Sequence, residues 1–359
     1  MIFIIELLVI ITTFIYQYRS KKDYRIPIYL AVSLMLIAGL RYNYKLDYNN
    51  YRIIFKEINV FSDVIHSIVE KGFVFLIFLF KKLGLGFYTF MLTVAVVSIL
   101  LKYKFFNKFS AIPLVSLLIY FLIFFIFNDM EQIRHGLAIG IALSSVTFVM
   151  QDKFWKFFGL VFVASLFHYS AIVFLLLYFV RDIKFNKKSL LVWGLSVAVF
   201  SFIDIMNIAK YINNNFIKNS YLNNKIALYS DQSIGLISVT LLIRLFVVAM
   251  CFIYLYNPEN KQSRVMFNAY FIGVCIFCLF RSIPILGVRG SVYFRYFELL
   301  LIPEYIVYIK NMLPTKTKYL KGISQKTVHC VCLSLLFGYY IIKFVQTLST
   351  SGYFSYLSI

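Results

Sequence analysis

The chain has 359 residues, of which 61% are hydrophobic and 14% are charged, and its mean hydropathy is +0.82. Soluble domains contain about a quarter charged residues, so this composition excludes an ordinary soluble protein. The net charge of +21 comes from basic residues spread over short loops between apolar runs, and this spacing favours positive-inside loops over a nucleic-acid surface. We therefore expect an all-α polytopic membrane protein that forms one domain over residues 1–359 and has no nucleic-acid partner.

Apolar runs of bilayer length predict about 10–12 transmembrane helices. The runs fall at 2–18, 26–40, 84–101, 112–127, 133–150, 189–206, 234–256, 265–283, 291–309 and 327–346. The N-terminal run lacks a basic n-region and a small-residue cleavage site, so we expect it to be retained as the first span.

Two apolar stretches do not fit a single span. Residues 72–82 are too short to cross a bilayer, and we expect them to dip into it without crossing. Residues 154–180 are long for one span and short for two, and the sequence SLFHYS lies at their middle. This pattern predicts a broken helix or a tight hairpin.

The basic loops set the expected orientation. If residues 19–25 are cytoplasmic, the loops 102–108, 152–156, 181–188, 257–264 and 310–326 are cytoplasmic as well. Three segments then face the opposite side of the membrane, at 41–71, 207–233 and 284–295. They mix tyrosines with asparagines, which is typical of sugar-binding surfaces and equally of an interfacial aromatic belt.

Arginines are prominent on this second side: Arg41, Arg52, Arg134, Arg281, Arg289 and Arg295. Guanidinium groups bind phosphate oxygens in bidentate fashion and stay charged at any working pH, so a converging set would bind a pyrophosphate. The alternative for each is an ion pair with a carboxylate or a position at the lipid headgroups. Arg134 begins an apolar span, and this placement favours a functional role.

Three side chains are candidate general bases on the same side: Asp47, Glu70 and His168. Asp47 stands among tyrosines that include Tyr48 and Tyr51, although an N-cap role would also explain it. His168 lies at the predicted break, where it could act as a base or form a structural hydrogen bond.

Other chemistries find no support in the chain. The five cysteines lie within or at the ends of apolar runs, so neither a disulfide framework nor a metal site is expected. A Ser-His-Asp order, a P-loop and an H-E-x-x-H motif are all missing, and no cofactor is expected.

Five motifs occur in a recognisable order: GLRYNYKLDYNNYRIIF (39–55), EKGF (70–73), NDMEQIRHGLAIGIAL (128–143), SLFHYSAIVFLLLYF (165–179) and VYFRYFELLLIP (292–303). Together they resemble the EpsG-like branch of Wzy-type polysaccharide (O-antigen) polymerases. The resemblance implies a GT-C-like glycosyltransferase of the bacterial inner membrane, with its active site facing the periplasm. Such an enzyme joins undecaprenyl-pyrophosphate-linked oligosaccharide repeat units into O-antigen or exopolysaccharide.

By motif position, the resemblance implies the site residues Arg41, Asp47, Tyr48, Glu70, Arg134, His168 and Arg295. The lipid-linked oligosaccharide and membrane lipids are the implied partners, and a chain-length regulator is a further candidate. Two other functions stay open from the sequence. One is an O-antigen ligase that uses the same donor, and the other is a flippase or transporter for lipid-linked oligosaccharides.

Overall fold

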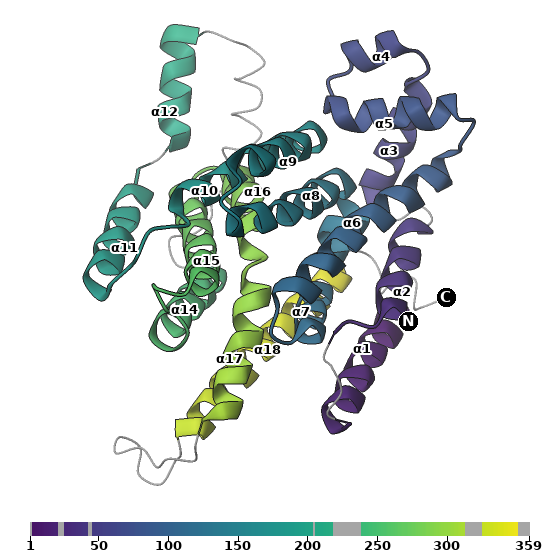
Figure 1. Ribbon diagram of the computed structural model, residues 1–359. Helices are drawn as coiled ribbons and strands as arrows, with labels where there is room; N and C mark the ends of the chain where they lie inside the picture. The colour runs from purple at the N-terminus through teal and green to yellow at the C-terminus, as the bar shows by residue number, and fades with distance from the viewer. Residues whose placement is uncertain are drawn as a thin grey trace. The chain divides into compact units, whose positions relative to one another are not determined.

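The computed structural model describes residues 2–20, 25–41, 45–203, 205–217, 238–312 and 325–350, and over these ranges the chain forms helices and no strand (Figure 1). The contacts within the chain cluster into two compact units. Unit 1 contains Met1–Ile172 and Ile302–Ile359, and unit 2 contains Val173–Leu301. The single polytopic domain expected from the sequence stays a prediction, and each unit is described by itself.

The elements up to residue 172 begin unit 1. They are α1 (Ile2–Arg19), α2 (Ile28–Gly39), α3 (Lys45–Glu57), α4 (Phe61–His66), α5 (Lys71–Lys82), α6 (Phe87–Phe109), α7 (Pro113–Tyr120), the π-helix η1 (Phe121–Glu131), α8 (Ile133–Met150), α9 (Phe154–Phe167) and the start of the 3-10 helix η2 (Tyr169–Leu175). The end of α17 (Glu298–Asn311) and all of α18 (Gln325–Thr350) complete the unit.

The elements of unit 2 follow η2. They are α10 (Leu176–Val180), α11 (Lys187–Ser201), α12 (Ile205–Ile212), the π-helix η3 (Asn213–Ile217), α14 (Val239–Tyr254), α15 (Lys261–Leu279), α16 (Pro284–Arg295) and the start of α17. α10, α11, α14 and α16 all pack against α15, which forms the core of the unit.

The helices confirm the expected all-α membrane architecture. Within the described ranges, six segments are long and apolar enough to cross a bilayer: Ile2–Arg19, Phe87–Phe109, Pro113–Glu131, Ile133–Met150, Lys261–Leu279 and Lys326–Ser349. Four shorter apolar helices accompany them, at Ile28–Gly39, Phe154–Phe167, Tyr169–Val180 and Val239–Tyr254. Their length and composition suit a multi-pass membrane protein.

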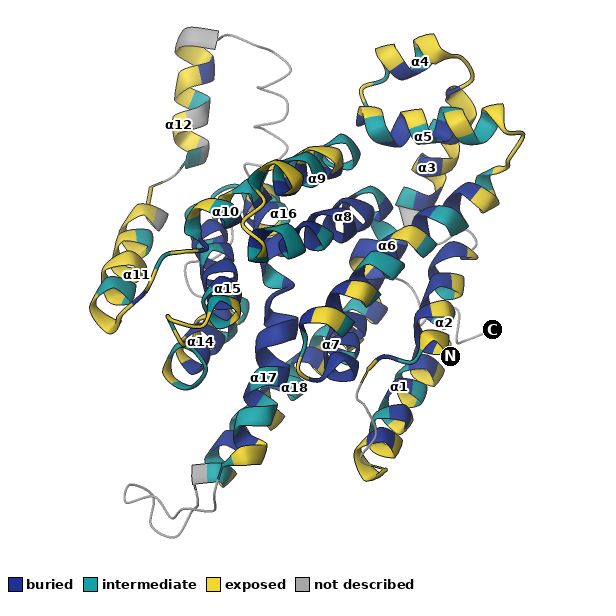
Figure 2. Ribbon diagram, in the orientation of Figure 1, coloured by how far each residue is buried: buried dark blue, intermediate teal, exposed yellow. Residues whose placement is uncertain are grey.

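The core of unit 1 is built around α8. This helix packs against α6 and α9, and α2 also packs against α6. α8 is buried along nearly its whole length, whereas α1 carries alternating buried and exposed residues (Figure 2). The short helices α3, α4 and α5 gather at one end of the unit, and their positions decide the geometry of the site below (Figure 1).

The predicted break within 154–180 is confirmed. Helix α9 ends at Phe167, and His168 adopts an extended backbone with φ −157° and ψ 118°. A 3-10 helix and the short α10 follow. Residues 72–82 lie in α5, a helix of 12 residues, which is short for a span.

Three segments expected to be loops or external segments lie at 102–108, 207–233 and 284–295. The expected loop at 102–108 is wrong, because α6 continues to Phe109 while the side chains of Lys102, Phe105 and Phe106 are buried. Residues 284–295 form helix α16. Most of the predicted external segment at 207–233 lies outside the described residues, and its first part forms α12 and η3.

Candidate active site in unit 1

Arg134 is held from several sides in the first turn of α8. Its Nη1 donates to Glu70 Oε2 in an ion pair, with the Glu70 side chain 9% exposed and that of Arg134 28% exposed. The guanidinium carbon also lies 5.8 Å from the ring centroid of Tyr51 and 5.9 Å from that of Phe73. Arg134 Nε is buried and has no hydrogen-bond partner among the described residues. Because Arg134 is fixed and keeps one donor uncommitted, it is suited to bind an anion.

Glu70 reaches Arg134 because of where α5 begins. Glu70 is the residue before the helix, and Gly72 lies in its first turn. A Cβ atom at Gly72 would lie 2.8 Å from both Cβ and the carbonyl oxygen of Leu166 on α9, which is closer than side chains approach in folded proteins. The glycine therefore lets α5 approach α9 and bring the Glu70 carboxylate to α8.

Several charged side chains lie near the phenol group of Tyr51. Burial raises the pKa of Tyr51, the nearby Arg134 and Arg41 lower it, and Asp47 raises it further. Arg41 is buried directly after α2 and donates to the carbonyl oxygen of Ala38. Asp47 is half-buried within the first turn of α3, past the N-cap position. Three of the residues singled out from the sequence, Arg41, Asp47 and Arg134, thus act on Tyr51, and Glu70 joins them through its ion pair with Arg134.

Tyr48 and Tyr51 of α3 are buried, whereas the rings of a sugar-binding surface would be exposed. Tyr48 is 2% exposed and packs edge-to-face on Phe87, with ring centroids 5.5 Å apart. Tyr51 is 3% exposed, and its ring lies against Phe73 and Arg134. Both rings therefore support the fold and the arginine, and direct sugar binding by them stays a prediction.

His168 lies beside the beginning of α8. Its ring stacks on that of His135 with centroids 4.4 Å apart, and His135 follows Arg134 in the chain. His168 Nδ1 forms a hydrogen bond of 2.8 Å with Ser170 Oγ. The break between α9 and η2 thus places an oriented imidazole next to the residue that follows Arg134.

A buried ion-pair network braces this part of the unit. Lys102 Nζ contacts both carboxylate oxygens of Asp129 at 2.6 and 2.9 Å, and it donates to the carbonyl oxygen of Gly136 at 2.9 Å. Asp129 also accepts from Tyr120 Oη at 2.7 Å and from Ser98 Oγ at 2.5 Å. A side chain at Gly136 would overlap the carbonyl oxygen of Asn128. The network thereby ties α6, the π-helix and the first turns of α8 together, and π-helices are frequent at functional sites.

The sequence alone did not single out Lys102, Asp129 and His135 as parts of a site. Lys102 follows an apolar run and resembles the basic end of a span, and Asp129 lies in a polar stretch that resembles a loop. One usable signal was the i, i+4 spacing of Ser98 and Lys102, which places both side chains on one helix face.

Unit 2 holds a separate set of polar residues. Arg295 Nε donates to Glu298 Oε2 at 3.3 Å, so the arginine predicted to bind pyrophosphate has a carboxylate beside it. Arg289 is half-buried on α16. Arg244 is buried in α14, lies 3.8 Å from the ring centroid of Phe277 and donates to Ser291 Oγ at 3.3 Å. An arginine inside an apolar run is itself a signal for function, and Arg244 was missed.

Comparison with known proteins gives one family. The model of the EpsG family matches residues 24–358. This chain belongs to the EpsG family. No curated protein and no solved structure matches the chain. The family predicted from the motif order is confirmed, and membership supports a polysaccharide polymerase-type function for this EpsG family member, a multi-pass membrane protein.

Within the described ranges, no three His, Cys, Asp or Glu side chains are grouped as metal ligands. All five cysteines are free thiols. The chemistry that the site can offer comes from arginines, carboxylates and an imidazole.

Proposed function

We propose that this EpsG family member is a Wzy-type polymerase of the GT-C kind. In this proposal it joins undecaprenyl-pyrophosphate-linked oligosaccharide repeat units at the periplasmic face of the bacterial inner membrane, and the product is O-antigen or exopolysaccharide. The observation that carries the proposal is Arg134, which is fixed by Glu70, Tyr51 and Phe73 and keeps Nε uncommitted. Family membership adds independent support.

The reaction transfers a glycosyl group. A hydroxyl oxygen of the acceptor sugar bonds to the anomeric carbon of the donor, and the bond from that carbon to the pyrophosphate oxygen breaks. The hydroxyl proton passes to a base on the protein, and undecaprenyl pyrophosphate leaves with the electron pair. Arg134 and Arg41 would stabilise the negative charge that develops on this leaving group.

The contacts of the three candidate bases distinguish their roles. Glu70 is engaged by Arg134 in an ion pair, so we assign Glu70 to positioning the arginine. Asp47 and His168 remain as candidates for proton removal. His168 is oriented through Nδ1 by its hydrogen bond with Ser170, and an imidazole held in this way is a candidate base.

The proposal is tested with purified protein in liposomes that contain lipid-linked repeat units. The expected product is a ladder of longer lipid-linked chains together with released undecaprenyl pyrophosphate. Transfer only to added lipid A core would indicate a ligase instead. Movement of the substrate across the bilayer without any new glycosidic bond would indicate a flippase, and either result would overturn the proposal.

A further inference from the structure

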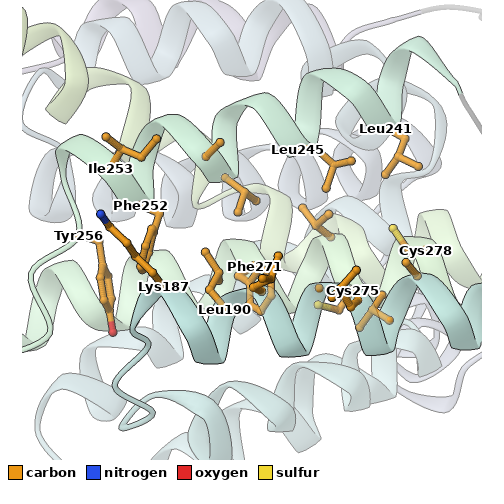
Figure 3. A pocket seen from close by; sticks show the side chains of 18 of the residues that line it. Lys187, Leu190, Leu241, Leu245, Phe252, Ile253, Tyr256, Phe271, Cys275 and Cys278 are labelled. Carbon is orange, nitrogen blue, oxygen red and sulfur yellow. The ribbon is translucent and has the colours of Figure 1, made fainter.

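A long apolar groove runs along unit 2 between α11 and α14. Its volume is about 1270 Å³, and its floor is the part of α15 that carries Phe271, Cys275 and Cys278. The lining residues recur every three or four positions on α11 and α14, from Asn186 to Phe202 and from Leu241 to Tyr256, so the groove follows one face of each helix for about four turns. Figure 3 shows these side chains pointing into the space between the helices.

The groove has one polar end. Lys187 and Tyr256 lie together there, and Leu241 and Cys278 lie at the opposite end (Figure 3). Between the two ends the walls are leucine, isoleucine, valine, alanine and phenylalanine, together with Gly194 and Cys275. A single apolar channel with one cation at its mouth has the polarity of a lipid: hydrocarbon along the groove and an anionic headgroup at its end.

Lys187 lines the groove, whereas three other basic residues near this end are bound to carboxylates. Lys184 Nζ is bound to Glu259 at 2.8 Å, and Arg181 and Arg264 both bind Asp182, at 2.8 and 3.3 Å. Among the described residues, Lys187 forms no ion pair and no hydrogen bond from its side chain. It is therefore the groove-lining cation whose charge is available to a ligand.

The charge pattern also indicates the leaflet. The segments 181–188 and 257–264, which flank this end of the groove and include the first residues of α11 and α15, contain six basic residues and two acidic ones. An excess of lysine and arginine marks the cytoplasmic side of a membrane protein, and anionic phospholipid headgroups are found there. A polymerase donor would carry its pyrophosphate on the opposite face, so the polar end of the groove suits a bilayer phospholipid better than the lipid-linked substrate.

We propose that the groove between α11 and α14 binds an anionic phospholipid of the bilayer, with a hydrocarbon chain along α15 and the phosphate against Lys187. Bound in this way, the lipid fills an apolar space that α11, α14 and α15 leave open. It also links α11 to α14, which otherwise make their main contacts with α15.

The test is native mass spectrometry of the full-length protein in mild detergent, titrated with phosphatidylglycerol or phosphatidylcholine. The wild type is expected to retain one phosphatidylglycerol in preference to phosphatidylcholine. Lys187→Gln is expected to reduce that preference about fivefold, since one lysine near a headgroup contributes about 1 kcal/mol. Lys188→Gln, which removes the same charge one residue along α11 but outside the groove, is expected to keep it.

A second variant blocks the groove without disturbing the helix. A Cβ atom at Gly194 meets nothing within 4 Å, and a larger residue in a helix interior costs less than glycine, so Gly194→Phe fills the groove from α11. It is expected to abolish lipid retention. Gly159→Phe is the matched control, because Gly159 is also open to space but lies on α9 of unit 1.

Three results would overturn the proposal. The first is a wild type with no preference for phosphatidylglycerol, and the second is undiminished retention by Gly194→Phe. The third is occupancy by undecaprenyl phosphate in preference to phosphatidylglycerol, lost in Gly194→Phe, which would assign the groove to the lipid carrier. These experiments measure lipid retention and not polymerisation, so a negative result would not affect the proposed function.

Discussion

Glu70 and Arg134 are 64 residues apart in the chain and form an ion pair where α5 meets the first turn of α8. Each partner is placed by a separate feature of the fold. Glu70 depends on the close approach of Gly72 to Leu166, and Arg134 depends on the network that fixes α8 to the π-helix. Small changes in either feature should therefore shift Glu70 or Arg134 in the candidate site.

Replacing Glu70 by Gln should leave Arg134 without its charged partner while keeping the side-chain volume. We expect the rate of chain elongation to fall by at least tenfold, because the guanidinium is no longer held towards the leaving group. The measurement is the initial rate of ladder formation in liposomes. Glu57→Gln, an exposed substitution at the end of α3, is the control and should keep the wild-type rate. Wild-type elongation by Glu70→Gln would remove the positioning role.

Breaking the buried pair of Lys102 and Asp129 should destabilise unit 1. Lys102→Met or Asp129→Asn alone leaves an uncompensated group among buried partners, and each should cost about 3–5 kcal/mol of unfolding free energy. The double variant Lys102→Met/Asp129→Asn removes both charges and should cost less than the sum of the single changes. Unfolding in a denaturing detergent titration measures all three. Strictly additive costs would show that the two side chains do not interact.

Gly136 should tolerate no side chain. Alanine at this position would overlap the carbonyl oxygen of Asn128 and crowd Asp129 Oδ1, so Gly136→Ala should destabilise the protein by about 1–3 kcal/mol or more. It should also reduce polymer formation, because the first turn of α8 carries Arg134 and His135. Gly159→Ala adds the same methyl group where the space is open and should be neutral or slightly stabilising. Equal melting temperatures for the two variants would contradict this packing.

Acid should weaken the hydrogen bonds at the start of α4, the short helix between α3 and α5. The pKa of Asp63 lies below its ordinary value of 3.8, first because the backbone amide of Val60 donates to the carboxylate and second because that of Asn59 does. A lowered folded-state pKa means that the stabilisation is present above pH 3.8 and is lost as the pH falls below it. Hydrogen exchange at the amides of Asn59 and Val60, corrected for intrinsic rates, should show protection at pH 6 that is smaller at pH 3.

The Asp63→Ala variant separates this effect from general acid unfolding. Its two amides should exchange rapidly at both pH values, while amides in α8 keep their protection at pH 6. If Asp63→Ala retained protection at Asn59 and Val60, the carboxylate would not be what holds these amides.

Hydrophobic patterning was sufficient to predict the helical membrane architecture and the break at SLFHYS, because both depend on local sequence. Arg134 could be singled out as a site candidate in the same way, since a cation beginning an apolar span needs an explanation. The pairing of Lys102 with Asp129 was not predictable, because it joins residues 27 positions apart through a π-helix that no simple periodicity predicts. Nor did the pattern of α3 show that Tyr48 and Tyr51 are buried, since interfacial and buried tyrosines have the same spacing.

Arg134 is the residue on which the proposed function depends most. Arg52, an exposed arginine on α3, is its control. The decisive measurement is the polysaccharide ladder from a deletion strain complemented with Arg134→Ala or Arg52→Ala, with both proteins quantified in the membrane. We predict single-repeat polysaccharide from Arg134→Ala and normal long chains from Arg52→Ala. Normal ladders from Arg134→Ala at wild-type protein levels would contradict the proposed site.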